Sequence, residues 1–494
     1  DTPQDLDPAA HSLSHDPHYW ETLLHLDPAC HTPPLLHPDS AIPAPLQAGL
    51  RRACAMKTTP SFNTLLADNI NKEIAYEEFS RELNALTNGA APGPSDATAS
   101  MVKAWPESVR KLVYKHMLNI WKTRASPTWI KDKVIKLAPK IAGNTELQNM
   151  RPISLYEVVR KVWTTIIAKR INLMWHNHDI LHKSQYGYKL DNGTPMPLLN
   201  VANAIEDAIH NKNSKQATFW DIRRAFDSIP RNLQRLAWTR LGVPADVAEW
   251  FVALDDKGLS FIGSPYYHHN RQLKTAEELY QNAAHHTKDP SLGFTADRGI
   301  GQGESASSLL WVAMYDILLE WIDPRNVHLH ADEVSDRPFS ADDIRRAIIN
   351  AYADDLATIT GGPRAADMQQ QQAVWLSAFC ALTGLVMHPA KIHATLLGPL
   401  PPGPLPTLSV YNQRWEEVAC TVDALVPTIK YLGVHLDLRH DGHSQYEATL
   451  ADIECRLSHL LLQAGSPQTK IAMIQSKILP VARYTAIVAN WTLA

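Results

Sequence analysis

The 494-residue chain is 45% hydrophobic and 20% charged, ordinary values for a globular protein that is long enough for several packed units. It contains no apolar run of the roughly 18 residues that cross a bilayer, so no membrane-spanning segment is predicted. Its five cysteines form no CxxC pair, which argues against a disulfide framework or a zinc site.

Charge is unevenly distributed along the chain. The formal net charge of −4 counts against a nucleic-acid-binding protein, whose surface is usually basic. However, residues 103–171 hold 15 Lys and Arg against 4 Asp and Glu, a local net charge of +11. This stretch could carry a phosphate-binding face, and the alternative is an ordinary solvated helical surface.

The N-terminal part is predicted to be a leader followed by helices. Residues 1–60 are rich in Pro, His and Asp and weakly periodic, which predicts an extended or poorly ordered leader. Residues 61–130 are predicted to form a helical extension, with apolar residues at helical spacing over 76–86 and 109–121. Turn residues at 91–96 separate these two helices.

From residue 131 the pattern mixes strands and helices. Pro230 and Gly242 stand in the first turn and after the last turn of one predicted helix, where each is favoured. In chain order the predicted elements are a strand at 134–138, a helix at 155–174, a strand at 218–222, helices at 230–242 and 307–321, and helical structure from about residue 448.

The most informative segment contains two adjacent acids, Asp354 and Asp355. Ile348 and Ile349 precede them and Leu356 begins the apolar run that follows, which predicts a hairpin with both carboxylates at its tip. Adjacent carboxylates repel each other, so burying them without a cation is costly. Hard oxygen ligands of this kind suit Mg²⁺.

Other aspartates compete with this pair or complete it. Asp342 and Asp343 form a second pair of adjacent acids, also preceded by alanine. Together with Ser340 they resemble the start of a helix, so we assign this pair to helix capping. A two-metal site needs a further carboxylate. Asp221, at the end of a predicted strand, is the first choice; Asp227 is the second, with helix capping or a local hydrogen bond as its alternative role.

The chain carries an ordered series of motifs at Lys136–Lys140, Arg151–Leu155, Ser184–Tyr188, Phe219–Asp227, Arg298–Gly303 with Ser307, Tyr352–Asp355, Thr383–Lys391 and Lys430–Gly433. This series resembles the reverse transcriptases, most of all those of non-LTR (LINE-type) retrotransposons. Each motif alone is weak, but their joint order over about residues 65–490 makes chance a poor explanation. One departure is Ser308, where the family usually has Pro.

The resemblance implies an α+β fold of the right-hand polymerase type, with fingers, an antiparallel palm sheet with helices, and a helical thumb. We assign the fingers to residues 131–217, the palm to 218–435 and the thumb to 436–494, where the end of the chain could cut it short. Two long insertions are expected in the palm, at about 263–290 and 323–340.

The same resemblance implies the catalytic groups. Asp221, Asp354 and Asp355 are expected to be catalytic metal ligands, and the backbone carbonyl of Ile222 could add another oxygen. The expected cofactor is a pair of Mg²⁺ ions, with Mn²⁺ as a substitute. Lys391 is a candidate general acid for pyrophosphate departure, and a plain surface lysine is the alternative.

Other positions are expected to contact the nucleotide and the primer. Lys140 and Arg151 would neutralise the triphosphate, with Lys136 competing for the first role and an exposed strand end as the alternative for Lys140. Phe226 would act as a steric gate against the ribose 2′-hydroxyl, unless it is an ordinary core residue. The remaining expected residues are Gln302 on the template side, Gly303 beside the nascent base pair, and Tyr431, Leu432 and Gly433 in the primer grip.

The leading hypothesis is RNA-templated DNA synthesis, by two-metal transfer of nucleotides from dNTPs to a primer 3′-hydroxyl during retrotransposon replication. It implies an RNA template, a DNA primer or target and dNTPs as partners, no membrane, and an intracellular place in the nucleus, the cytoplasm or both; the oligomeric state stays open. One alternative is a catalytically inactive relative that only binds RNA, which Ser308 mildly favours. Another is an RNA-dependent RNA polymerase, which Phe226 argues against.

Overall fold

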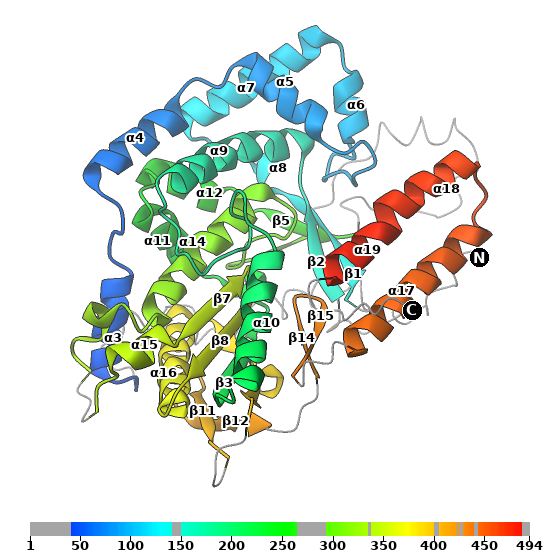
Figure 1. The fold of residues 1–494 in the computed structure, drawn as a ribbon. Helices are drawn as coiled ribbons and strands as arrows, with labels where there is room; N and C mark the ends of the chain where they lie inside the picture. Colours follow the sequence, from blue (N-terminus) through cyan, green and yellow to red (C-terminus); the bar gives the residue numbers. More distant parts are fainter. Residues whose placement is uncertain are drawn as a thin grey trace.

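The computed structural model describes residues 41–140, 150–263, 293–333, 337–399, 405–420, 422–423, 428–438 and 443–486. These residues form a mixed α+β structure with a four-stranded sheet, a five-stranded sheet and three small two-stranded pairs (Figure 1). The α+β class predicted from the sequence is therefore confirmed.

The N-terminal helices pack against the long helix α9 (Val158–Asn177), which comes later in the chain (Figure 1). Aromatic rings make much of this contact: Phe79 and Tyr114 each lie 6.3 Å from Trp163, measured between ring centroids. The helical structure predicted for 61–130 is confirmed. The elements are α4 (Pro60–Asn71), α5 (Tyr76–Ala85), α6 (Ala99–Ala104), α7 (Glu107–Thr123) and α8 (Thr128–Lys131).

Helix α3 (Ala44–Ala53) lies where the sequence predicted a poorly ordered leader, so that prediction is wrong for this part. Leu50 is fully buried, and a Cβ atom on Gly49 would stand 2.5 Å from the ring of Trp321. Close tertiary packing therefore selects this helix, although Gly49 weakens its local signal. The part of the leader before residue 41 lies outside the described residues.

The four-stranded sheet has the strand order β2-β1-β5-β6. Strand β1 pairs antiparallel with β2 and parallel with β5. The strand predicted at 134–138 is confirmed, but the helix predicted from Leu155 begins only at Val158, because Leu155 pairs with Val134 in the sheet. The strands are β1 (Lys133–Pro139), β2 (Met150–Leu155), β5 (Leu259–Ile262) and β6 (Gly293–Thr295).

The five-stranded sheet forms the centre of the molecule, in the order β13-β10-β3-β8-β7. Side chains alternate along β3: Ala217 and Phe219 join one hydrophobic core, and Trp220 joins the other. Both faces of the sheet are therefore buried. The strands are β3 (Lys215–Trp220), β7 (Ile348–Tyr352), β8 (Asp355–Gly361), β10 (His393–Leu397) and β13 (Val422–Asp423), and β4 (Ile222–Arg223) pairs separately with β9 (Val386–Met387).

Helices cover both faces of this sheet. In Figure 1, α10 (Pro195–His210) lies in front of the sheet and α16 (Ala365–Thr383) behind it. Helix α14 (Ser305–Ile322) packs between α16 and α9, so it joins the two sheets of the molecule. Helices α11 (Arg231–Arg240), α12 (Ala245–Ala253) and α14 confirm the predicted helices at 230–242 and 307–321 and add one more.

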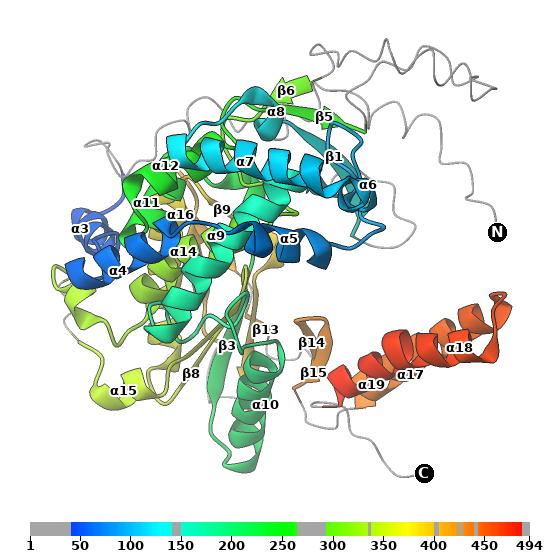
Figure 2. The same cartoon turned by 90° about the horizontal axis from the view of Figure 1, so that it is seen from above.

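The C-terminal helices lie to one side of the five-stranded sheet, with a small hairpin between them and the sheet (Figure 2). This hairpin is β14 (Thr428–Tyr431) and β15 (Val434–Asp437). The predicted C-terminal helical structure is confirmed as α17 (His443–Leu462), α18 (Pro467–Met473), the π-helical η8 (Ile474–Ile478) and α19 (Leu479–Thr485).

The two expected insertions are only partly described. The first falls almost wholly outside the described residues, between β5 and β6. The second includes the short helix η6 (Val327–His330), which packs against α3. A further hairpin, β11 (Leu408–Tyr411) with β12 (Glu417–Cys420), packs against α16. Within the described part of the chain, no helix is both long and apolar enough to cross a membrane.

Candidate active site

The predicted acidic hairpin is confirmed. Strands β7 and β8 pair up to Tyr352 and Asp355, which leaves Ala353 and Asp354 as a two-residue turn. Ala353 has a backbone φ of 55°, a left-handed conformation that costs an alanine roughly 1 kcal/mol. The turn therefore holds both carboxylates at the edge of the sheet, at some cost in strain.

Asp221 lies beside this turn because of the strand register. Trp220 pairs with Leu356 in the β3–β8 ladder, so the next position along β3 is opposite Asp355. The chain then leaves β3 to form β4, and the backbone carbonyl of Asp221 accepts a hydrogen bond from the amide of His388 at 3.0 Å. Three strands thus bring together the three predicted acidic ligands.

The electrostatics show that these carboxylates act on one another. Loss of hydration raises the pKa of Asp355 to about 6, and the charges of Asp354 and Asp221 add to this effect. Burial also raises the pKa of Asp354, with a further contribution from Asp221. A cation between the carboxylates would relieve the repulsion.

Asp227, the second choice for the further carboxylate, faces different neighbours. Burial raises its pKa to about 6, against the charges of Lys133, Arg224 and Lys140. The β3–β8 register places Asp221, and not Asp227, opposite Asp355, and the charge of Asp221 raises the pKa of both Asp354 and Asp355. The geometry therefore favours Asp221.

The competing acidic pair is a helix cap, as predicted. Ser340 and Asp343 form a capping box at the start of α15 (Ala341–Arg345). Asp342 forms exposed ion pairs with Arg345 at 3.3 Å and with Arg346 at 2.6 Å. These two arginines neutralise the charge of Asp342, so this residue does not need a metal ion to balance it.

The donor set at the hairpin suits a hard divalent cation. Asp221, Asp354 and Asp355 offer only oxygen ligands. Since Asp221 bonds to β9 through its carbonyl, the alternation of an antiparallel ladder turns the carbonyl of Ile222 away from β9. Among the described residues, no group of three or more Asp, Glu, His or Cys side chains is already close enough to hold a metal ion.

Cations gather opposite the acidic turn. Arg151 pairs with Ala138 across β1 and β2, so its side chain shares a face of the sheet with Lys136 and Lys140. Desolvation lowers the pKa of Lys140, and the nearby charges of Lys391 and Arg151 lower it further. The Nζ atom of Lys391 lies 3.7 Å from Oδ2 of Asp221. These predicted residues thus surround one site.

Phe226 and the loop before α14 carry the remaining residues that the motifs predicted for this site. The ring of Phe226 is half-buried and stacks on Trp311 at 4.9 Å between centroids. The carbonyl of Gln302 accepts a hydrogen bond from Ser154 at 2.7 Å, and a Cβ on Gly303 would stand 2.4 Å from the carbonyl oxygen of Ser154. The close approach of the Ser154 carbonyl on β2 therefore leaves no room for a side chain at Gly303, independently of any nucleic acid.

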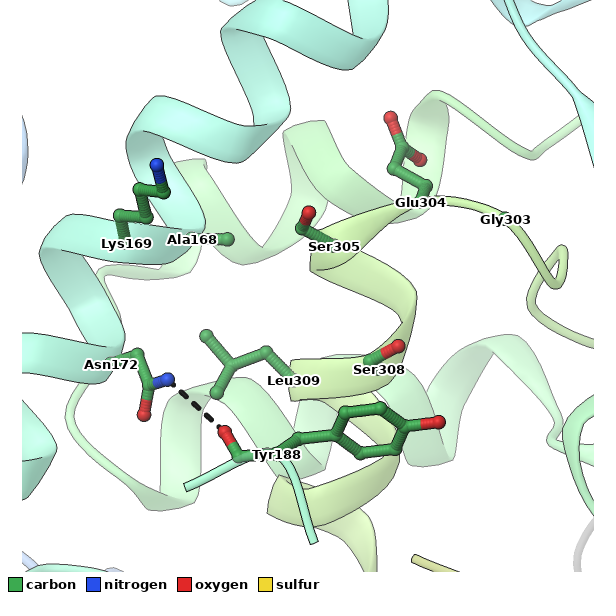
Figure 3. A pocket seen from close by; sticks show the side chains of 9 residues that line it. All are labelled: Ala168, Lys169, Asn172, Tyr188, Gly303, Glu304, Ser305, Ser308 and Leu309. Atoms are coloured by element: carbon green, nitrogen blue, oxygen red, sulfur yellow. Dashed lines mark hydrogen bonds between the residues drawn. The ribbon is translucent and has the colours of Figure 1, made fainter. Parts of the chain in front are cut away.

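A hollow of about 430 Å³ opens between α9 and the start of α14, next to Gly303 (Figure 3). Tyr188 crosses its lower side, and its backbone carbonyl accepts a hydrogen bond from the Asn172 amide at 3.2 Å. Ser308, which replaces the usual Pro of the motif, lines the hollow and interacts with the Tyr188 hydroxyl. The departure from the motif therefore gives this wall a polar contact.

The predicted primer-grip residues form the turn between β14 and β15. Leu432 and Gly433 have backbone φ values of 49° and 80° and form the tip, where Gly433 is exposed and Leu432 is partly buried. Tyr431 is buried: its ring lies against Phe219, and its hydroxyl donates to the carbonyl of Asn350 on β7 at 3.4 Å. Tyr431 thus anchors the hairpin, and only the tip is presented outwards.

Sequence reasoning did not assign a role to two groups at this site. Gln185 lies within a recognised motif, and its side chain binds the backbone of the acidic turn. Arg160 is 1% exposed and joins Glu304, directly after Gly303, to Asp255. The sequence did not single out this buried ion pair, because Arg160 is one of several basic residues of α9 and its partners are distant in the chain.

The comparisons with known proteins agree with this geometry. A family profile described as "Reverse transcriptase (RNA-dependent DNA polymerase)" matches residues 138–436, more than half of the chain. This chain belongs to the reverse transcriptase family. The right-hand polymerase fold and the LINE-type resemblance predicted from its motifs are confirmed, since its relatives are polymerases of such mobile elements.

Among curated relatives of this reverse transcriptase, the "Probable RNA-directed DNA polymerase from transposon BS" of Drosophila melanogaster is 25% identical over 406 residues, 81% of this chain and 40% of that protein. The "RNA-directed DNA polymerase from mobile element jockey" of the same species is 24% identical over 159 residues, 32% of this chain and 17% of that protein. The chain thus spans about two fifths of the first relative's length.

A solved structure with a related arrangement is an apo telomerase from Candida tropicalis, truncated from its C-terminal domain. It covers 68% of this chain and 59% of its own, with 10% sequence identity and a TM-score of 0.38.

Proposed function

We propose that this reverse transcriptase synthesises DNA on an RNA template during replication of a mobile element. It would transfer nucleotides from dNTPs to the 3′-hydroxyl of a DNA primer or target. The observation that carries this proposal is the placement of Asp221 beside Asp354 and Asp355, with Lys140 and Arg151 on the facing sheet. We place this activity in the nucleus, the cytoplasm or both.

The residues divide the chemistry between them. Asp221, Asp354 and Asp355, with the carbonyl of Ile222, would hold two Mg²⁺ ions, or Mn²⁺. When bound, such ions stabilise the charge on the attacking and leaving oxygens. Lys140 and Arg151 hold the triphosphate by charge-assisted hydrogen bonds. The 3′-hydroxyl loses its proton to solvent as its oxygen bonds to the α-phosphorus and the α–β phosphate bond breaks, and Lys391 gives a proton to the departing pyrophosphate.

Other residues would position the substrates. Phe226 presents the ring face that Trp311 leaves open, where it would exclude a ribose 2′-hydroxyl. Gln302, Gly303 and the hollow beside them would face the template and the nascent base pair. Leu432 and Gly433 would support the primer end, with Tyr431 as their anchor.

Primer extension on an RNA template with Mg²⁺ tests the proposal, with deoxy- and ribonucleotides compared in parallel. Asp354→Asn removes a metal ligand and is expected to reduce extension roughly a thousandfold, because metal stabilisation is worth several kcal/mol. The matched control is Asp342→Asn in the capping pair, for which we expect activity within about twofold of the unmodified chain.

Three results would contradict parts of this proposal. No extension by the folded, unmodified chain would favour the inactive RNA-binding alternative. A preference for ribonucleotides would favour an RNA polymerase. A large loss with Asp342→Asn and none with Asp354→Asn would move the active site to the other acidic pair.

A further inference from the structure

The side chain of Gln185 forms hydrogen bonds with both the backbone N–H and the backbone carbonyl of Ala353, the first residue of the acidic turn. The amide nitrogen of Gln185 donates to the carbonyl of Ala353 at 3.3 Å, and its amide oxygen accepts from the backbone N–H of Ala353 at 3.0 Å. The backbone N–H of Gly187 also donates to that oxygen, at 2.8 Å. Because the oxygen has two donors, the orientation of the amide is fixed.

This contact continues a short strand pairing. The N–H of Ala351 donates to Ser184 and the N–H of Tyr186 donates to Ala351, both at 2.8 Å, so this segment runs parallel to β7. The pairing cannot extend to Ala353, whose φ of 55° takes the chain out of the strand. The Gln185 amide, which has the same donor and acceptor as a peptide group, replaces the missing rung.

The contact is tightly enclosed. Gln185 is 1% exposed and Ala353 is 6% exposed, so water cannot replace either hydrogen bond without rearrangement. A Cβ atom on Gly187 would lie 2.4 Å from the nitrogen of Ala353, so the segment and the turn are in direct contact. A buried peptide group without a partner costs about 1–3 kcal/mol, which gives the strained turn a reason to move if Gln185 is lost.

The turn is also held from the other side. The hydroxyl of Tyr315, on α14, donates to the backbone carbonyl of Asp354 at 3.3 Å. Gln185 and Tyr315 therefore bind consecutive residues of the turn from two separate elements. Together they fix the backbone from which Asp354 and Asp355 project.

We propose that Gln185 is the positioning residue of the acidic turn, and that its amide sets the direction in which Asp354 and Asp355 present their carboxylates to a divalent cation. This inference rests on the proposed function for the identity of the cation site. It predicts that loss of the amide weakens metal binding although no metal ligand is removed.

The chain supplies a matched control. Gln370 on α16 makes the same double contact elsewhere: its amide nitrogen donates to the carbonyl of Ser409 at 2.9 Å and its oxygen accepts from the N–H of Ser409 at 2.8 Å. Gln370→Met therefore removes the same pair of hydrogen bonds to one residue, and Gln185→Met removes such a pair together with the hydrogen bond from Gly187. Only Gln185→Met removes them at the acidic turn.

The experiment measures Mn²⁺ affinity by titration of the free protein, and kcat and KM for dNTP in primer extension. For Gln185→Met we expect Mn²⁺ affinity and kcat to fall about 10–100-fold, the usual effect of losing a group that orients metal ligands, with little change in KM. Hydrogen exchange should accelerate in the peptide that contains Ala353. Gln370→Met should leave Mn²⁺ affinity, kcat, KM and this hydrogen exchange unchanged within about twofold.

Gln185→Glu is the second variant, because it keeps the shape and the acceptor but loses the donor; it should show the same loss if Gln185→Met does not fold. Mn²⁺ affinity in both Gln185 variants within twofold of that in the unmodified chain would overturn the inference. If the unmodified chain binds Mn²⁺ but extends no primer, the proposed function fails while the titration still decides the role of Gln185. If the unmodified chain binds no Mn²⁺, both the proposed function and this inference fail.

Discussion

Two groups of buried carboxylates lie within the fold and have opposite properties. Asp255 and Asp316 each face at least one guanidinium group, Arg160 at 2.9 Å and Arg240 at 2.5 Å respectively. Burial raises the pKa of both carboxyls, but the charges of Lys133 and Arg160 at Asp255, and of Lys57 and Arg240 at Asp316, lower it further than burial raises it. At the acidic turn, burial and mutual repulsion raise the pKa instead, and they are opposed by a backbone hydrogen bond at Asp354 and by the charge of Arg151.

The two groups of carboxylates therefore have different roles, one in holding the fold together and the other in the chemistry of the site. The paired carboxylates join elements that are distant in sequence: Arg160 also donates to the backbone carbonyls of Ile130 and Leu254. The acidic turn contributes charge that its protein surroundings do not neutralise. Such a group of carboxylates is destabilising by itself, which indicates that it binds a ligand with a positive charge.

The largest effect in this comparison is expected for Arg160→Met. It leaves Glu304 and Asp255 buried without their main partner, which typically costs about 3–5 kcal/mol. Denaturant unfolding measures the change. Arg235→Met, which removes an exposed ion pair with Glu249, is the control and should cost less than about 1 kcal/mol. Equal losses would show that burial does not distinguish the two pairs.

A smaller, pH-dependent effect is expected for Asp323→Asn. Hydrogen bonds from His182 and Arg325 outweigh burial and lower the pKa of Asp323 to about 2. A lowered pKa stabilises the fold above the unfolded value near 4, and this contribution is lost as the pH falls towards 2. The substitution should cost up to about 2 kcal/mol at pH 7. Its cost in unfolding experiments should shrink below about pH 4.

An effect of the opposite sign is expected for Asp355→Asn. The raised pKa of about 6 means that ionised Asp355 weakens the fold above that pH, and this penalty disappears as the carboxyl is protonated below it. Without metal, the variant should melt at a higher temperature than the unmodified chain at pH 8, and at nearly the same temperature at pH 4. A lower melting temperature at pH 8 would remove the contrast between the two groups.

Local patterns predicted much of the site. The flanks of Asp354 and Asp355 predicted the hairpin, and the neighbours of Asp342 and Asp343 predicted the cap, because both depend on residues only a few positions away. The proximity of Asp221 to the hairpin came from the family resemblance. Its physical basis, the β3–β8 register, is a long-range pairing that spacing alone does not reveal.

What the sequence did not predict depends on distant partners. The Gln185 amide gains its role from Ala353, more than 160 residues later in the chain. Helix α3 exists because Trp321 and α14 bury it. The late start of α9 follows from the pairing of Leu155 with Val134, which overrides helical periodicity in the same residues.

The pairing of β5 with β6 has a practical consequence. Phe261 and Gly293 are opposite each other in this pairing, so the two ends of the segment that connects the strands are neighbours. The entropy of closing such a loop rises only slowly with its length. A fluorescent protein or an affinity tag inserted between these strands should therefore leave the folded core intact. It would provide a reporter attached near the four-stranded sheet that uses neither chain terminus.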